Sequence, residues 1–311
     1  MELYFAPLEG ITGYVYRNVH ARHFSGIDKY FAPFISTSSH GFQKRKEVRD
    51  ILPENNEQMH LVPQLLSNCA QDFIDYGRKI YELGYSEINL NLGCPSRTVV
   101  SKGKGAGFLA EPEALDRFLD QVFSQLKGKI SIKTRIGKDD PEEFFGLMEI
   151  YNKYPVSELI IHPRTQTDYY KNKPNLKVFG EAVRHSRHPV CYNGDICTKE
   201  EFDNLTERFP NLQAVMIGRG FLKNPALAQE IVMGEHLKIT VLKQYHDELY
   251  QQYKELFSGD KPVLFKMKEL WLYLIEYFPE YEKYGKRIKK TQRLCDYEGI
   301  AAELFSRLRQ S

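Results

Sequence analysis

The chain has 311 residues, of which 42% are hydrophobic and 27% are charged, and its formal net charge is +2. This composition allows a large apolar core, and the charge is too mild to indicate a nucleic-acid partner, so any RNA-binding surface must come from local clustering. No apolar run approaches the ~20 residues that cross a membrane, and the first residues lack the pattern of a signal peptide.

The five cysteines are scattered, odd in number and without a CxxC pair. This pattern argues against a disulfide framework and against a zinc or iron–sulfur site. We therefore expect no metal and a reducing, cytoplasmic location. The cysteines are Cys69, Cys94, Cys191, Cys197 and Cys295.

Short β-type runs alternate with longer helical stretches such as residues 72–83 and 112–126. The runs are apolar and bounded by Gly, Pro or polar residues, which is typical of buried parallel strands. Eight successive β-then-α units predict a (β/α)8 barrel of the TIM type, with a doubly wound open sheet as the main alternative. The predicted strands are Leu3–Ala6, Tyr30–Phe34, Leu61–Leu65, Ser86–Leu90, Ile130–Thr134, Glu158–His162, Val190–Tyr192 and Ala214–Ile217.

The alternation ends near Gly234, and the rest of the chain has helical patterns without strands. A single barrel takes about 250 residues, which leaves room for one small appended domain. We therefore expect a catalytic barrel over residues 1–235 and an all-helical domain over residues 236–311. The predicted helices of that domain are Leu242–Phe257, Val263–Phe278 and a run from Cys295 onward.

Polar residues gather where the predicted strands end. All strand ends of a barrel converge on one face, and active sites lie there. Segments that are far apart in the chain thereby predict one site. Its candidate residues are Pro7, Glu9, Gln64, Asn91 to Cys94, Lys133, His162, Arg164, Asn193 to Asp195, Gly218 and Arg219.

The segment Asn91 to Ser96 places the thiol of Cys94 on a tight turn after a strand. No histidine is close in sequence to act as a base, and an unperturbed thiol has a pKa of about 8.5, so a protonated thiol would be a plausible general acid. A small buried hydrophobic residue is the alternative. The Gly-rich run at 103–107 predicts a flexible loop over the site.

Lys133 lies inside a predicted barrel strand, where lysine is almost never buried unless it is paired. Three interpretations follow: a Schiff-base nucleophile, a cation facing an anionic cofactor, or a salt-bridged core lysine. His162 and Arg164 end the next strand, and an arginine there suits a phosphate or a uracil carbonyl. The Asn193–Asp195 and Gly218–Gly220 segments follow strands seven and eight, where barrels commonly bind phosphate.

A basic run lies in the helical region. Most such runs are solvated helix faces, although nearby tyrosines at 277, 281 and 284 favour an RNA contact surface. Its cations are Lys283, Lys286, Arg287, Lys289, Lys290 and Arg293.

Together these segments resemble the tRNA-dihydrouridine synthases, an FMN-dependent family. The resemblance rests on residues 6–10, on Gln64, on the cysteine motif at 91–96, on the Lys133 strand and on the segments at 162–165, 193–195 and 218–220. It covers the barrel by motif and the helical region in architecture only. It implies reduction of the C5–C6 double bond of a specific tRNA uridine by FMN, with NADPH (or NADH) as reductant.

The resemblance also implies residue roles. Cys94 would be the proton donor, Lys133 would face the N1–O2 edge of the flavin, and Gln64 would bind its ring. Residues Pro7, Leu8 and Glu9 would line one side of the flavin, and Asn193, Gly194, Asp195, Gly218 and Arg219 would hold its phosphate end. His162 would contact the flavin, Asn91 and Arg164 the uracil, and Lys286, Arg287, Lys289 and Lys290 the RNA.

Two positions depart from the family pattern, since Pro163 replaces the usual glycine and Glu9 a small residue. Proline removes a backbone N–H, so a donor is lost there. Two other functions stay open at this point. One is a flavin barrel reductase similar to dihydroorotate dehydrogenase that acts on a small molecule, and the other is a non-catalytic RNA-binding barrel.

Overall fold

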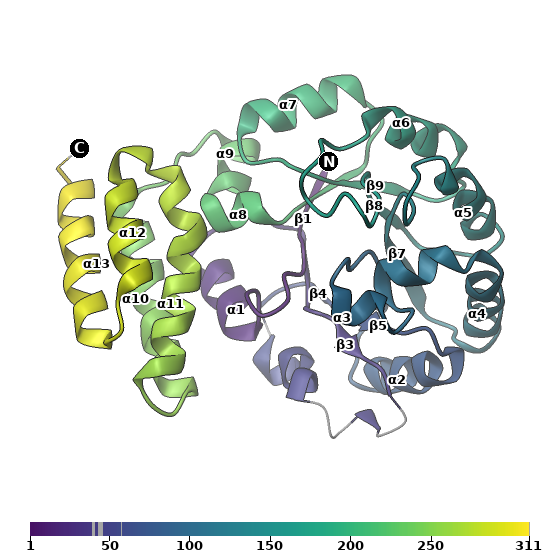
Figure 1. The fold of residues 1–311 in the computed structure, drawn as a ribbon, viewed down its shortest axis with the longest axis horizontal. Coiled ribbons are helices and arrows are strands. Elements are labelled where there is room, and N and C mark those ends of the chain that lie inside the picture. Colours follow the sequence, from purple (N-terminus) through teal and green to yellow (C-terminus); the bar gives the residue numbers. More distant parts are fainter. Residues whose placement is uncertain (39–40, 43–45, 57, 311) are drawn as a thin grey trace. The chain divides into compact units, whose positions relative to one another are not determined.

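The computed structural model describes residues 1–38, 41–42, 46–56 and 58–310 (Figure 1). The chain forms two compact units, and neither is a single stretch of sequence. The expected functional division between residues 235 and 236 stays a prediction. The first unit comprises Met1–Pro7, Asp28–Gly194 and Thr206–Ile217, and the second comprises Leu8–Ile27, Asp195–Leu205 and Gly218–Ser311.

The first unit contains one sheet in which every pairing is parallel. The strands follow the order β3-β5-β6-β7-β8-β9-β10-β1-β2-β4. Their bounds are β1 Glu2–Phe5, β2 Lys29–Phe31, β3 Ile35–Ser36, β4 Leu61–Val62, β5 Gln64–Leu66, β6 Glu87–Leu92, β7 Lys129–Arg135, β8 Leu159–His162, β9 Val190–Asn193 and β10 Ala214–Ile217.

The ten strands close into a barrel of eight because two of the eight are interrupted. Only Pro63 separates β4 from β5, and proline has no N–H to give to the ladder. The segment Leu61–Leu66 pairs with β2 and β3 on one side and with β6 on the other. The two ends of the strand order are therefore joined, which confirms the predicted barrel and excludes the open sheet. The second predicted strand is shorter than expected, since it ends at Phe31.

Helices cover the outside of this sheet, as Figure 1 shows for α2, α4, α5 and α6. The predicted helices at 72–83 and 112–126 are confirmed as α2 and α4. The bounds are η2 Lys46–Ile51, η3 Pro53–Asn55, α2 Ala70–Glu82, α3 Arg97–Val100, η4 Gly105–Ala110, α4 Pro112–Gln125, α5 Glu143–Tyr151 and α6 Leu176–His185; α7, Lys199–Arg208, divides between the two units.

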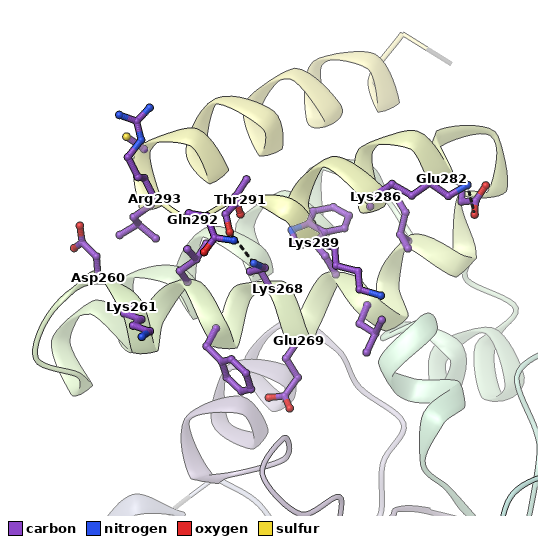
Figure 2. Close-up of a pocket in the computed structure, with 18 of the residues that line it drawn as sticks. Asp260, Lys261, Lys268, Glu269, Glu282, Lys286, Lys289, Thr291, Gln292 and Arg293 are labelled. Carbon is purple, nitrogen blue, oxygen red and sulfur yellow. Dashed lines mark hydrogen bonds and ion pairs between the residues drawn. The ribbon is translucent and has the colours of Figure 1, made fainter.

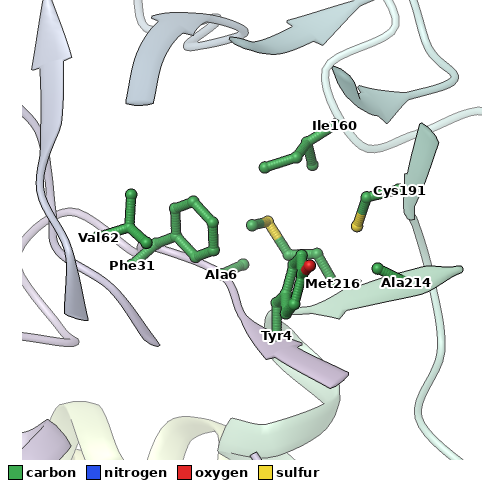
Figure 3. Close-up of a cluster of buried hydrophobic side chains, with 8 residues drawn as sticks. All are labelled: Tyr4, Ala6, Phe31, Val62, Ile160, Cys191, Ala214 and Met216. Atoms are coloured by element: carbon green, nitrogen blue, oxygen red, sulfur yellow. The ribbon is translucent and has the colours of Figure 1, made fainter. Parts of the chain in front are cut away.

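Alternate side chains of the strands point into the barrel, where eight of the residues form a buried apolar cluster (Figure 3). Phe31 and Tyr4 pack with their ring centroids 5.7 Å apart. The cluster draws on β1, β2, β4, β8, β9 and β10, together with Ala6, which directly follows β1. The cluster consists of Tyr4, Ala6, Phe31, Val62, Ile160, Cys191, Ala214 and Met216.

The inward faces of β6 and β7 differ, because they are polar. All six residues of β6 are buried, although Glu87, Asn89 and Asn91 alternate with apolar neighbours. On β7 the buried polar positions include Ser131 and Arg135. The parallel register places Asn89 beside Ser131 and Asn91 beside Lys133. One side of the barrel interior is thus a polar strip.

The second unit is helical, which confirms the prediction for residues after 234 within the described chain. The helix α1 packs against α10, where Arg22 and His23 both pair with Glu248. The long helices α10, α11 and α13 share a core that includes Trp271 and Tyr297. The bounds are α1 Tyr14–His23, α8 Arg219–Lys223, α9 Leu227–Met233, α10 Ile239–Leu256, α11 Asp260–Leu274, η5 Ile275–Tyr277, η6 Pro279–Tyr281, α12 Glu282–Lys290 and α13 Leu294–Leu308.

Within the described ranges, no helix is both long and apolar enough to span a membrane. No cluster of three or more His, Cys, Asp or Glu side chains in those ranges has the arrangement of a metal site.

Candidate active site

Cys94 lies on the turn that follows β6, and the Asn91 side chain holds that turn in place. Asn91 Oδ1 accepts hydrogen bonds from the backbone N–H groups of Gly93 and Cys94, both at 3.0 Å. Cys94 is half-buried rather than enclosed. The structure therefore presents the thiol on a fixed turn, as a reacting group requires.

The Gly-rich run packs against this turn. We predicted a flexible loop here, but Gly105, Ala106 and Gly107 are buried in η4. Gly105 has φ +57°, and a Cβ there would lie 2.8 Å from the carbonyl oxygen of Cys94. Glycine is needed at this position because only it combines a left-handed backbone with so close an approach. The run therefore packs directly against the cysteine turn.

Lys133 lies on the inward face of β7, and burial lowers the pKa of its ammonium to about 8. The nearby Arg135 lowers this pKa further, whereas Cys94 and Cys191 raise it. The Lys133 ammonium makes no hydrogen bond or ion pair with any residue in the described ranges. A salt-bridged core lysine is therefore ruled out within the described chain, and the position has the character of a cation without its anion.

Gln64 and Asn91 are both buried, and their amides are bonded to other protein groups. Gln64 is fully buried, and its amide bonds Asn89 and Asn91, each at 2.7 Å. Asn91 is 7% exposed, and its Oδ1 is already used by the cysteine turn. Any contact of these amides with a ligand would have to use their second N–H or lone pair.

Arg135 is a functional candidate that the sequence did not single out. It is buried, and burial lowers the pKa of its guanidinium. Its three nitrogens donate to three carbonyls: Nε to Gly93 at 3.0 Å, one terminal nitrogen to Thr165 at 2.7 Å, and the other to Tyr169 at 2.9 Å. Arg135 thus ties the cysteine turn to the loop after β8. Only the planar fork of arginine offers this geometry.

His162 and Arg164 bond one another at 2.9 Å between the His162 Nε2 and an Arg164 terminal nitrogen. Since arginine only donates, His162 Nε2 is the acceptor and its proton sits on Nδ1. Pro163 lies between them in a tight turn closed by Arg164 N–H donating to His162 carbonyl at 2.7 Å. The fixed φ of proline suits such a turn, so the departure from the family glycine fits the local backbone.

Asn193, the last residue of β9, and Gly194, which follows it, shape the next part of the first unit. The Asn193 side-chain amide donates to the Met216 carbonyl at 2.8 Å and so joins β9 to β10. A Cβ on Gly194 would lie 2.1 Å from the Tyr192 hydroxyl oxygen, so glycine is required there. Pro7, at the end of this unit's first segment, is half-buried.

The remaining candidates belong to the second unit. Arg219 pairs with Asp195, with 2.5 Å between an Arg219 terminal nitrogen and Asp195 Oδ1. A phosphate bound by Arg219 would therefore share that cation with a carboxylate. Gly218 caps α8, Leu8 donates its N–H to Thr12 Oγ1 at 2.9 Å, and Glu9 is exposed.

Five of the six cations of the basic run lie on α12 and Arg293 precedes α13; the α12 cations fall on two faces of that helix. Lys286 and Lys289 line a groove of about 1160 Å³ between α11 and α12 (Figure 2). Arg287 lies on the other face and pairs with Glu303 of α13 at 2.8 Å. Tyr284 is buried and bonds the same carboxylate, so it is a core residue and not part of an RNA contact surface as we expected.

The groove combines cations with exposed apolar side chains. Phe265 and Leu272 of α11 are 66% and 54% exposed. Lys261, Lys268 and Arg293 add positive charge, while Asp260, Glu269, Glu276 and Glu282 also line it. Lys268 donates to the Thr291 carbonyl at 2.7 Å and so caps the end of α12. Cations beside exposed apolar surface suit a ligand with both phosphates and flat bases.

Comparison with known proteins supports the same family. A protein with the printed name "Probable tRNA-dihydrouridine synthase" from Staphylococcus epidermidis is 26% identical over 257 residues, which is 80% of this chain and 77% of that protein. "Probable tRNA-dihydrouridine synthase 2" from Bacillus subtilis is 27% identical over 267 residues, 83% of this chain and 81% of that protein.

Among solved structures, morphinone reductase in complex with tetrahydroNAD is similar in fold. Its TM-score is 0.53 at 11% identity, over 76% of this chain and 88% of that one. The family model described as "Dihydrouridine synthase" matches residues 4–303. The match spans both the barrel strands and the long C-terminal helices, and it confirms the predicted resemblance and enzyme class. The chain therefore belongs to the dihydrouridine synthase family.

Proposed function

We propose that this protein reduces a uridine of tRNA to dihydrouridine, with FMN as cofactor and NADPH or NADH as reductant. The observation that carries the proposal is Lys133, a half-buried lysine beside the cysteine turn whose ammonium has no anionic partner among the described residues. The names of the Staphylococcus epidermidis and Bacillus subtilis relatives supply the substrate.

The residues present fit a flavin. A buried cation is unfavourable unless an anion accompanies it, and the N1–O2 edge of a reduced flavin carries negative charge. We assign Lys133 to that edge, with Gln64 and His162 beside the ring and Pro7, Leu8 and Glu9 along one side. Asn193, Gly194, Asp195, Gly218 and Arg219 are assigned to the phosphate end. When bound, the flavin supplies the hydride for the C5–C6 bond.

The chain's own residues supply a proton and its position. We assign Cys94 as the proton donor for C5 of the uracil. Asn91 holds the Cys94 turn through two backbone N–H groups, and Arg135 holds its carbonyl side at Gly93. Asn91 and Arg164 are the proposed uracil contacts. A target base within folded RNA must leave its stack to reach Cys94, which costs a few kcal/mol.

The groove on α11 and α12 is the proposed RNA contact of the second unit. Of the four cations predicted from the sequence, Lys286 and Lys289 line the groove, whereas Arg287 and Lys290 do not. Phosphate neutralisation by lysines gives binding that weakens steeply with salt. Exposed Phe265 offers a surface on which a base could stack.

The decisive experiment maps dihydrouridine in tRNA from cells with and without the gene and repeats the reaction with purified protein, FMN, NADPH and tRNA lacking the modification. We expect one uridine position to lose its modification in the deletion and regain it in vitro. Oxidation of the reduced flavin should be faster with tRNA than without it. A purified protein that binds no flavin, or whose flavin is oxidised by a small molecule but not by tRNA, would contradict the proposal.

A further inference from the structure

An unbroken chain of hydrogen bonds crosses the polar strip of the barrel. Asn91 Nδ2 donates to Gln64 Oε1 at 2.7 Å, and Gln64 Nε2 donates to Asn89 Oδ1 at 2.7 Å. Asn89 Nδ2 donates to Ser131 Oγ at 3.0 Å, and Ser131 Oγ donates to Glu87 Oε1 at 2.6 Å. The chain therefore links the cysteine turn to a carboxylate at the start of the same strand.

The direction of this chain is fixed from both ends. At one end, the N–H groups of Gly93 and Cys94 can only donate, so Asn91 must present Oδ1 to them and Nδ2 to Gln64. At the other end, the Glu87 carboxylate can only accept, so the Ser131 hydroxyl must point toward it. Both requirements give the same orientation to every amide in between.

Burial makes this orientation strict. Gln64, Asn89 and Ser131 are each 0% exposed, so water does not compete for their hydrogen bonds. A single reversed amide would leave a donor facing a donor or an acceptor facing an acceptor, and buried polar groups without partners are costly. Lys29 Nζ lies 3.2 Å from the second oxygen of Glu87, so both oxygens of this side chain have partners.

We propose that Glu87 is a positioning residue for Cys94, which it orients through Ser131, Asn89, Gln64 and Asn91. The inference rests on the proposed role of Cys94 for its importance in the reaction, but the coupling itself is a property of the folded chain. Glu87 itself bonds Ser131 and Lys29, and reaches the turn only through the side chains between them. The rise of a strand places it about 13 Å from Asn91 along β6.

The proposal can be tested by reversing the donor-to-acceptor direction of this chain of hydrogen bonds. In Glu87→Gln, an amide nitrogen must face either Lys29 or the hydroxyl hydrogen of Ser131, so one contact is lost. In Asn91→Asp, a carboxylate oxygen replaces the donor to Gln64, so one contact is again lost. In the double variant every amide can turn over, because the new amide at position 87 donates to Ser131. Ser131 then donates to Asn89, Asn89 to Gln64, and Gln64 to the new carboxylate at position 91.

The matched control is Glu158→Gln. Glu158 lies near the same lysine, with 4.0 Å between Glu158 Oε2 and Lys29 Nζ, but it bonds Tyr4 and not Ser131. Glu158→Gln removes a carboxyl group at the same end of the barrel without altering the chain of hydrogen bonds. Residues more than about 10 Å apart without shared partners usually contribute additively, so Glu158→Gln with Asn91→Asp should be additive.

Two readouts are measured on the full chain as purified: the thermal unfolding midpoint, and the rate of Cys94 alkylation by iodoacetamide, quantified on the Cys94 peptide by mass spectrometry. Glu87→Gln should change the alkylation rate about two- to tenfold, the equivalent of one hydrogen bond. In the Asn91→Asp background the same substitution should act in the opposite direction. The Glu87/Asn91 double variant should unfold at a higher temperature than additivity allows.

Additive effects of Glu87→Gln and Asn91→Asp would overturn the proposal. So would a deviation from additivity between Glu158→Gln and Asn91→Asp as large as that between Glu87→Gln and Asn91→Asp. If Asn91→Asp does not fold, Ser131→Ala decides: Glu87→Gln should no longer alter Cys94 alkylation once that hydroxyl is gone, and a persisting effect overturns the proposal. Neither readout involves RNA, so a failure to form dihydrouridine would contradict the proposed function alone.

Discussion

Lys133 and Asn91 are direct partners in the parallel register of β6 and β7, yet their side chains differ in hydrogen bonding. The Asn91 amide is bonded on the protein side to Gln64 and to two backbone N–H groups. The Lys133 ammonium has no such bond to any residue in the described parts of the chain. A hydrogen-bonded amide beside a cation without such bonds supports the proposal that an anion binds at Lys133.

Replacement of Lys133 tests whether FMN supplies that anion. Lys133→Met keeps the length of the side chain and removes its charge, and we expect FMN to bind about 10-fold or more weakly, in the range of a charge-assisted hydrogen bond. Fluorescence titration of the apoprotein measures this. Lys129→Met, on the exposed start of the same strand, is the matched control. Equal FMN affinity in the two variants would show that Lys133 does not contact the flavin.

The same lysine predicts a pH dependence of FMN binding. Its pKa in the free protein is about 8, below the ordinary value of 10.5, because burial disfavours the charged form. Below this pKa the cation is present, whereas above it Lys133 must take up a proton before it can donate a charged hydrogen bond to the flavin ring. FMN affinity should therefore fall by up to about tenfold per pH unit above the pKa, and Lys133→Met should lose this dependence. A flat wild-type profile from about pH 7 to 10 would contradict the assignment, since this window extends to both sides of the Lys133 pKa of about 8.

Cys94→Ala should separate the two halves of the reaction. Reduction of the flavin by NADPH needs no protein proton donor, so its rate should stay near that of the wild type. Dihydrouridine formation should fall about 100-fold or more, the usual contribution of a positioned general acid. Single-turnover assays with tRNA measure both. Cys69→Ala, an exposed thiol of the same unit, should leave both rates unchanged; dihydrouridine formation by Cys94→Ala at the Cys69→Ala rate would dismiss the proton-donor role.

The groove predicts which cations of α12 meet RNA. Changing Lys261, Lys286 and Lys289 to Ala removes three groove charges, and changing Lys283, Arg287 and Lys290 to Ala removes three from outside it. The first set should weaken tRNA affinity and reduce its salt slope by up to about one unit per contact, because each phosphate contact releases counterions. Affinities at two salt concentrations compare the sets, and an equal effect of both would show that the groove is not the contact.

Glu158 predicts how stability varies with pH. Burial, with Glu87 and Glu2 nearby, raises the pKa of Glu158 to about 7, although Lys29 and Tyr4 partly oppose the shift. The native state thus keeps a proton that the unfolded state releases near pH 4.5. Stability from this group is complete below the unfolded pKa and is lost as pH rises to the folded pKa, by about 1–3 kcal/mol.

Glu158→Gln cannot ionise, so it should flatten that part of the profile. The unfolding free energy, from urea denaturation at about pH 5 and about pH 8, should fall less with pH in the variant than in the wild type. Glu54→Gln, an exposed acid, serves as the control and should follow the wild type. A variant profile as steep as the wild type would mean that Glu158 is already ionised at the lower pH.

Much of the fold follows from the sequence, because buried parallel strands are short apolar runs whose pattern survives without tertiary information. The predicted Ala214–Ile217 agrees with β10 residue for residue. The prediction of the second strand was wrong at its C-terminal end, since Pro33 and its neighbours leave the sheet before the chain rejoins it at Ile35. Local propensity does not report where a strand loses its partner.

The polar strip was harder to predict. Residues 87–92 alternate polar and apolar side chains, a pattern that ordinarily indicates one solvent-exposed face. In the barrel both faces are buried, and the polar one is satisfied by side chains from Gln64 and Ser131. Arg135 was missed for a similar reason, because its three carbonyl partners come from loops that only the tertiary fold brings together.

The interrupted make-up of the second unit has a consequence for synthesis on the ribosome. The helix α1 leaves the ribosome early, but Tyr16 and His20 are buried against Tyr245 of α10 and, for His20, bonded to the Pro225 carbonyl at 3.1 Å. Domains generally fold as units during synthesis, from the N-terminus onward. Here the nascent chain must carry the buried face of α1 without its partner while the whole barrel is translated. A chain that ends before α10 would leave that face permanently exposed.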